Sequence, residues 1–211
     1  MALRAEGLRA QGLISRLLPR RLKCLVGGDV TDIRSRRLVF LIECLLNQNA
    51  RDRGAAESPA VDRELLELLV EAGIGMAQIP CPEIACLGFE RKRAPGQSLR
   101  QALEAEQPAA CCLHLAAVTA ERIQSYLDQG YEVVAILGGN EQSPGCAVHT
   151  AGAQGAGLTD RSGIFMQALA EELGRRGIRI PFRGIRDADP VLLERDIDWL
   201  RGRIADERQQ S

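Results

Sequence analysis

Three cysteines of this 211-residue chain each follow an apolar run that is typical of a buried strand. They are Cys44 after residues 38–43, Cys81 after residues 74–80, and Cys146 after residues 133–137 and a short glycine-rich loop. The carboxyl ends of parallel strands meet at one edge of a sheet, and ligand sites gather at that edge. We therefore expect the three thiols to converge, although they are far apart in the sequence. Three soft ligands around an open position would suit an iron–sulfur cluster that still has chemistry to do.

The elements that must position these thiols alternate between strand and helix patterns. After the first cysteine, Ser58-Pro59 is expected to start a helix, because serine caps free amides and proline suits the first helical position. The apolar stripe of this helix runs from residue 65 to residue 70, and Gly73 is expected to end it in the left-handed conformation.

Further helices are expected over residues 109–129, from a cap at Ser162 to about residue 174, and from Asp189-Pro190 onward. Residues 178–182 alternate between apolar and polar types, as a strand does. The polar stretch 90–108 is expected to wrap the surface near the site. Strands that alternate with helices imply parallel βαβ units, so the predicted fold is a three-layer α/β/α sandwich with a mainly parallel, Rossmann-like sheet.

Composition divides the chain into a basic N-terminal extension, residues 1–36, and an α/β domain, residues 37–211. Residues 1–28 carry six basic side chains against one acidic side chain, while the whole chain has a net charge of −1. The extension is expected to form a loose amphipathic helix for packing or dimer docking. The alternatives are a basic arm for nucleic acid or another acidic partner and a transit-like segment.

The seven cysteines are an odd number, and a chain of this size does not need disulfides to stabilise its core. No secretory signal and no apolar run long enough to span a bilayer is visible in the sequence, so we expect a cytoplasmic protein with no membrane association. In a reducing compartment, thiols serve metals or catalysis more often than disulfides.

Short motifs surround the three strand-end cysteines. In chain order they are Cys44-Leu45-Leu46, Cys81-Pro82-Glu83 and Ser143-Pro144-Gly145-Cys146, followed downstream by Ser162-Gly163-Ile164-Phe165 and Gly177-Ile178. In these motifs and their order the chain resembles the 2-thiouracil desulfurase family. The resemblance covers about residues 38–182.

The resemblance implies an enzyme that removes sulfur from thiolated pyrimidines without net redox change. It also implies a [4Fe-4S] cluster held by Cys44, Cys81 and Cys146, in which one iron has no protein ligand. Such an iron can act as a Lewis acid on the sulfur of the substrate. The resemblance further implies that Glu83 acts as a general acid or base and that Ser143 donates a hydrogen bond to the substrate.

Two residues after the first motif are expected to contact the small-molecule substrate. Arg51 matches an arginine that is common in the family, whereas Asn47 stands where the family usually has glycine. Residues 51–54 read Arg-Asp-Arg-Gly in place of the family's Arg-Tyr-Asp-Gly. These departures widen the expected substrate from thiouracil to a thiolated pyrimidine or a related heterocycle.

Other interpretations of the remaining ligand types stay open. Cys86 could supply a fourth ligand and close the cluster, and His149 could line the pocket. Cys111 and Cys112 are adjacent, so a helix would point them about 100° apart, and we expect core packing there. A closed four-ligand site would suit zinc. The alternatives are therefore a non-catalytic iron–sulfur or zinc-binding protein, or a cluster-dependent sulfur-transfer or redox enzyme.

Overall fold

This computed structural model describes residues 32–150 and 157–206. The chain divides into two compact units, Met1–Arg34 and Ser35–Ser211. Of the first unit the structure describes residues 32–34, where the side chains of Asp32 and Arg34 form an ion pair of 2.8 Å. The amphipathic helix expected in the basic extension lies outside the described residues.

The described part of the second unit is built on a four-stranded sheet in which every strand pair is parallel. The strand order is β2-β1-β3-β4. The strands are β1 (Arg37–Ile42), β2 (Gly75–Ile79), β3 (Glu132–Gly138) and β4 (Phe182–Gly184). The predicted α/β sandwich with a parallel sheet is therefore confirmed.

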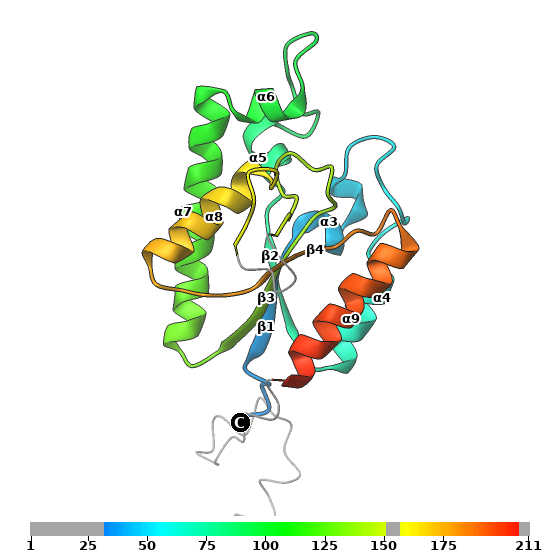
Figure 1. Ribbon diagram of the computed structural model, residues 1–211, viewed down its shortest axis with the longest axis vertical. Helices are drawn as coiled ribbons and strands as arrows, with labels where there is room; N and C mark the ends of the chain where they lie inside the picture. The colour runs from blue at the N-terminus through cyan, green and yellow to red at the C-terminus, as the bar shows by residue number, and fades with distance from the viewer. Residues whose placement is uncertain (1–31, 151–156, 207–211) are drawn as a thin grey trace, which may run out of the picture. The chain divides into compact units, whose positions relative to one another are not determined.

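Helices cover both faces of this sheet (Figure 1). On one side lie α4 (Arg63–Glu71) and α9 (Pro190–Asp206), and on the other lie α5 (Pro82–Leu87), α7 (Glu106–Asp128) and α8 (Ile164–Arg175). The short helices α3 (Glu43–Leu46), η1 (Gln48–Ala50) and α6 (Leu99–Leu103) belong to the loops that follow the strands. Residues 39–42 of β1 are fully buried, because helices pack on both faces of a parallel sheet. No described helix is long and apolar enough to cross a membrane.

The expected start of α4 is wrong by four residues. The helix begins at Arg63, and the side chain of Asp62 caps it by accepting a hydrogen bond of 3.1 Å from the amide of Leu65. The Ser58 hydroxyl donates instead to the carbonyl of Val61, at 2.6 Å, within the preceding turn. Gly73 takes the left-handed conformation expected after the helix, with φ of 70°.

Two further local expectations are corrected, and a short helix forms in a stretch for which none was expected. The N-cap of α8 is Gly163, and Ser162 uses its hydroxyl in hydrogen bonds of 3.0 Å with the amide and the carbonyl of His149. The last strand forms over Phe182–Gly184, beyond most of the alternating pattern in 178–182. The polar stretch 90–108 contains α6, which Ser98 and Gln101 start with reciprocal side-chain and backbone hydrogen bonds. By contrast, Asp189 caps α9 as expected.

Candidate functional site

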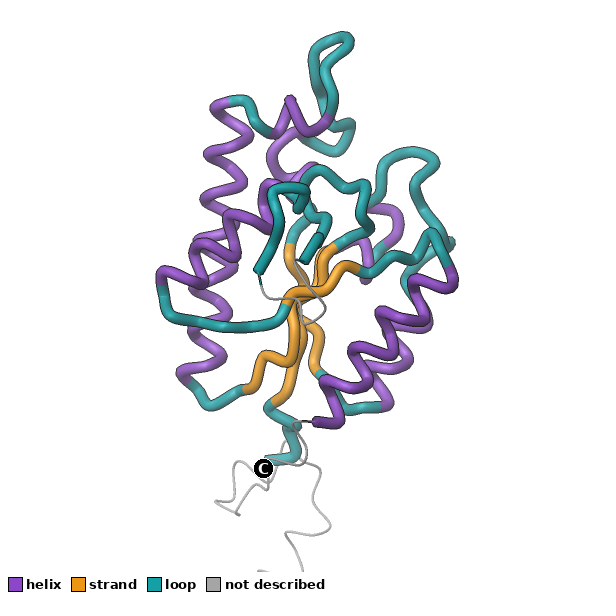
Figure 2. The backbone as a smooth tube through the Cα atoms, viewed as in Figure 1, coloured by secondary structure: helices purple, strands orange, loops and turns teal. Residues whose placement is uncertain are grey.

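The loops that follow β1, β2 and β3 gather at the carboxyl edge of the sheet (Figure 2). The sequential strands β1 and β2 are neighbours, whereas β3 lies on the opposite side of β1. The chain therefore changes direction across the sheet between β1 and β3. Loops that leave two such strands run apart and open a crevice, which is the usual place for a ligand in an open α/β sheet.

Cys44, Cys81 and Cys146 line one cavity of about 230 Å³ at this edge, which we call the thiol cavity. Cys44 lies in α3, directly after β1, and Cys81 is the N-cap of α5, after β2. Cys146 lies in the loop after β3, where Ala147 pairs with Gly139. The other described lining residues are Ala50, Arg51, Asp52, Ala55, Glu83, Arg91, Leu99, Gly139, Asn140, Gln142, Ser143 and Pro144.

Two contacts fix the positions of these thiols. The Glu43 carboxylate, one residue before Cys44, accepts a hydrogen bond of 2.9 Å from the amide of Cys81 and so joins the first two loops. A Cβ atom on Gly139 would lie 2.7 Å from the sulfur of Cys146, a separation that side chains do not tolerate. Glycine at this position therefore lets the third thiol lie directly against the end of β3.

The thiols interact with one another and with a nearby guanidinium group. A hydrogen bond with Cys146 lowers the pKa of Cys44, and the charge of Arg51 lowers it further, while burial opposes both effects. The same hydrogen bond raises the pKa of Cys146, together with its complete burial. Burial raises the pKa of Cys81 to about 11. Cys44 is therefore the thiol that ionises first, and a ligand cation would be needed to hold all three as thiolates.

A buried ion pair orients the carboxylate that the sequence indicated. Glu83 is held by Arg91, whose Nε donates to Glu83 Oε2 at 2.7 Å, and by Ser143, whose hydroxyl donates to Glu83 Oε1 at 3.0 Å. Arg91 also donates to the carbonyl of Ala50 at 2.8 Å, and its Nη2 lies 4.0 Å from the sulfur of Cys81. The Ser143 hydroxyl lies 3.1 Å from the sulfur of Cys146. Glu83 and Ser143 thus form a hydrogen-bonded path from the arginine to a thiol.

The two residues expected to bind substrate lie in different environments. Arg51 lines the thiol cavity, and its side chain is buried in an ion pair with Asp187. Asn47 is exposed and does not line the cavity; its side chain accepts hydrogen bonds from the amide and side chain of Asn49 and so stabilises the turn after α3. One carboxylate oxygen of Asp187 is buried without a hydrogen-bond partner in the structure.

Within residues 32–150 and 157–206, no group of three or more His, Cys, Asp or Glu side chains is placed to hold a metal ion. This finding concerns donors that surround one ion. In an iron–sulfur cluster each cysteine binds a different iron, so the sulfurs are spread around a larger body. The thiol cavity brings together three thiols from three separate loops, and those of Cys44 and Cys146 hydrogen-bond to each other.

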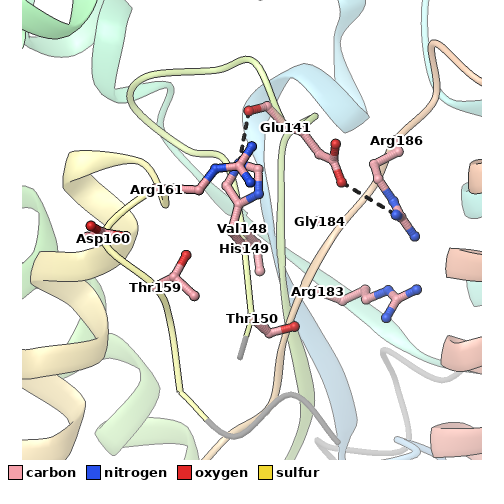
Figure 3. A pocket seen from close by; sticks show the side chains of 10 residues that line it. All are labelled: Glu141, Val148, His149, Thr150, Thr159, Asp160, Arg161, Arg183, Gly184 and Arg186. Atoms are coloured by element: carbon pink, nitrogen blue, oxygen red, sulfur yellow. Dashed lines mark hydrogen bonds and ion pairs between the residues drawn. The ribbon is translucent and has the colours of Figure 1, made fainter. Parts of the chain in front are cut away.

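A second cavity of about 380 Å³ lies beside the loop after β3, and this is where His149 is found (Figure 3). His149 Nε2 lies 3.0 Å from the carbonyl oxygen of Glu141, whose carboxylate in turn faces Arg186 at 3.5 Å. The imidazole is absent from the described lining of the thiol cavity. Cys86 is also absent from that lining, and its sulfur forms a disulfide bond with Cys111.

Sequence reasoning missed two charged residues of the site and the disulfide. Arg91 comes from the polar stretch that is expected to wrap the surface near the site, yet it is 4% exposed, with a left-handed φ of 49°. Asp187 follows β4, more than one hundred residues from its partner Arg51. Neither has a local motif, and only the tertiary fold brings each beside its partner. For Arg91, the one sequence signal of a role in the site is its position eight residues after Glu83, the candidate catalytic carboxylate.

Comparison with known proteins identifies one similar protein, MJ0003 of Methanocaldococcus jannaschii, which is described as uncharacterized. The two chains are 25% identical over 148 residues, which represent 70% of this chain and 85% of that protein. No protein-family model and no solved structure matches the chain. Fold and site together thus define an α/β protein with a thiol-lined crevice at the carboxyl edge of its sheet.

Proposed function

We propose that this protein is a [4Fe-4S]-dependent desulfidase that removes sulfur from a thiolated pyrimidine or a related heterocycle. The observation that carries the proposal is the thiol cavity itself. Three thiols from three loops, a buried carboxylate and a hydroxyl line the same cavity of about 230 Å³. These are the residues that the resemblance to the 2-thiouracil desulfurase family assigns to the cluster and to catalysis.

The residues present fit such a cluster in their donor chemistry. Thiolates are the usual ligands of iron–sulfur clusters. The hydrogen bond from Cys146 and the charge of Arg51 lower the pKa of Cys44 and favour its thiolate form, whereas burial raises the pKa of Cys81, so this thiol would ionise only on binding iron. The described lining contains no fourth cysteine and no histidine. Cys44, Cys81 and Cys146 would therefore hold the cluster and leave one iron without a protein ligand.

When bound, the cluster would supply a Lewis acid that polarises the thiocarbonyl group of the substrate. The chain itself would supply the proton chemistry. Arg91 holds Glu83 as an acceptor, and one Glu83 oxygen faces Ser143 at the cavity wall. In this position Glu83 can take a proton from an attacking water and return it to a ring nitrogen of the substrate.

Ser143 has a second part in this scheme. Its oxygen accepts a hydrogen bond of 3.2 Å from the amide of Cys146, which fixes the hydroxyl between Glu83 and the sulfur of Cys146. If Cys146 were a thiolate ligand, its sulfur would have no proton and could only accept hydrogen bonds. The Ser143 hydroxyl can then donate to the sulfur, to Glu83 or to negative charge that develops on the substrate. Arg51, held by Asp187, presents a further cation to the substrate.

A zinc-binding protein is the competing function. Zinc in a structural site takes four ligands, mostly Cys and His. A fourth ligand would have to be a carboxylate, since the described lining offers three thiols together with Asp52 and Glu83. Purification under anaerobic conditions separates the two, because a zinc protein is colourless and holds no acid-labile sulfide.

The activity test uses anaerobically reconstituted protein and a panel of thiopyrimidines and thionucleosides. We expect release of one sulfide per substrate, and we expect Glu83→Gln to lower turnover by about 10²–10⁴-fold, the usual contribution of a general acid or base, while iron content stays unchanged. The matched control is Glu104→Gln, an exposed carboxylate in an ion pair of 3.1 Å with Arg100. Unchanged turnover in Glu83→Gln would remove Glu83 from the mechanism. A lack of sulfide release from every member of the panel by the iron-loaded protein would overturn the proposed activity.

A further inference from the structure

A second group of cysteines lies at the carboxyl end of α5, whereas the thiol cavity lies at the amino end of this helix. Cys86, in α5, forms a disulfide bond with Cys111 in α7. The free thiol of Cys112, the next residue of α7, lies 3.7 Å from the sulfur of Cys86. The sulfur of Cys86 is therefore bonded to one cysteine of α7 and in contact with the next. Cys112 is fully buried, whereas Cys86 and Cys111 are half-buried and within reach of solvent.

We infer that Cys86, Cys111 and Cys112 form a redox-responsive thiol–disulfide site, in which Cys86 can pair with either neighbour on α7. The exchange is balanced within the chain. The Cys112 thiolate attacks the sulfur of Cys86, the Cys86–Cys112 bond forms, and the Cys86–Cys111 bond breaks. Cys111 leaves as a thiolate and takes up the proton that Cys112 lost, so no oxidant or reductant is consumed.

The contact geometry supports exchange rather than a permanent crosslink. Neighbouring residues on a helix point about 100° apart, yet the sulfur of Cys86 reaches both Cys111 and Cys112. A purely structural crosslink would not need the third sulfur. The half-buried disulfide also lets an external dithiol open the bond, and the dithiol is then oxidised to its own disulfide.

The position of this site on α5 gives the exchange a consequence. Cys81 is the N-cap of α5 and Glu83 lies in its first turn, while Cys86 lies one turn later in the same six-residue helix. The disulfide therefore ties the helix that carries two residues of the thiol cavity to the long helix α7. Changing or opening this tether changes how firmly α5 is held. The inference rests on the sulfur contacts alone and does not require a cluster in the cavity.

Single-cysteine variants test the exchange directly. Trypsin releases residues 64–91, with Cys81 and Cys86, and residues 101–122, with Cys111 and Cys112, so a disulfide between the helices appears as one linked pair of peptides under non-reducing conditions. After treatment with oxidised glutathione, which takes up the two electrons and is reduced to two thiols, we expect Cys111→Ser and Cys112→Ser each to form a linked pair and Cys86→Ser to form none. Cys111→Ala repeats the test if the serine variant does not fold. A linked pair that disappears in both Cys111 variants would overturn the inference, because Cys86 would then pair with Cys111 alone.

The exchange in the wild-type chain needs a slow measurement. Burial raises the pKa of Cys112 to about 11, so about 10⁻⁴ of this thiol is ionised at pH 7. The oxidised protein is incubated for hours, quenched with acid, and the linked peptides are fragmented between residues 111 and 112. We expect both pairings. A single pairing that persists at every time would contradict the exchange.

Amide hydrogen exchange tests the effect on α5. Adding a dithiol should make the amides of residues 84–87 exchange several-fold faster, while those of α9, which carries none of these cysteines, should not change. Equal exchange rates in α5 before and after reduction would show that the disulfide does not control this helix and would refute that part of the inference. Iron content is measured separately, so failure here is distinguishable from failure of the proposed desulfidase.

Discussion

Replacing Arg91 by methionine should destabilise the protein much more than removing an exposed arginine. The side chains of Arg91 and Glu83 are 3% and 10% exposed, and their ion pair is 2.7 Å long. Removing one partner of a buried pair costs about 3–5 kcal/mol, because the other charge stays buried. The carbonyl of Ala50, which accepts from Arg91 at 2.8 Å, also loses its donor, at about 1 kcal/mol more. We therefore expect Arg91→Met to lower the free energy of unfolding by about 4–6 kcal/mol.

Urea unfolding followed by circular dichroism measures this loss, and two variants complete the test. Arg63→Met removes an ion pair whose side chains are 83% and 61% exposed, so it should cost less than about 1 kcal/mol. Arg91→Met combined with Glu83→Gln removes the buried charge as well and should recover most of the stability. Losses that are equal in Arg91→Met and Arg63→Met would refute the buried pair. A double variant as unstable as the sum of the single variants would do the same.

Three further predictions concern the cavity and α4. Gly139→Ala puts a Cβ atom 2.7 Å from the sulfur of Cys146, so it should abolish iron binding and lower the free energy of unfolding by about 1–3 kcal/mol. Gly202→Ala, whose Cβ atom would have no neighbour within 4 Å, should change neither quantity. Iron content and urea unfolding measure the two effects. In iron-free protein, iodoacetamide should alkylate Cys44 before Cys146, because Cys44 is less buried and its pKa is lowered. Equal rates of alkylation at the two cysteines, measured by peptide mass spectrometry, would contradict this prediction. Burial raises the pKa of Asp62, so Asp62→Asn, which keeps the helix cap, should stabilise the fold at neutral pH. The gain in stability should vanish below the ordinary carboxyl pKa, where the aspartic acid is protonated in both the folded and the unfolded state. A gain that does not depend on pH would exclude burial of the charge as its cause.

The fold could be predicted from the sequence because its strongest signals are local. The apolar runs that became β1 and β3 are nearly continuous, as buried parallel strands require, and Gly73 and Gly130 stand where helices must stop. The sequence does not define a helix boundary where two residues of similar capping ability compete. Asp62 starts α4 in place of Ser58, because the serine hydroxyl is used within its own turn.

Only the site residues that directly follow a strand could be predicted from the sequence. The sequence places three thiols after three strands, and the parallel sheet then brings them to one cavity. The partners that tune this cavity could not be predicted. Arg91 and Asp187 carry no local pattern, and their pairing depends on loops that meet only in the folded chain. The disulfide was missed for the same reason, since Cys86 and Cys111 are brought together only when α5 packs on α7.

The iron and acid-labile sulfide content of anaerobically reconstituted protein tests the central claim most directly. We expect about four irons and four sulfides per chain in the wild-type protein. Cys112→Ser, whose sulfur lies outside the described lining of the thiol cavity, should match that content, and Cys146→Ser should lose it. Wild-type protein that holds one zinc and no sulfide, or Cys146→Ser protein that retains the full cluster, would contradict the account.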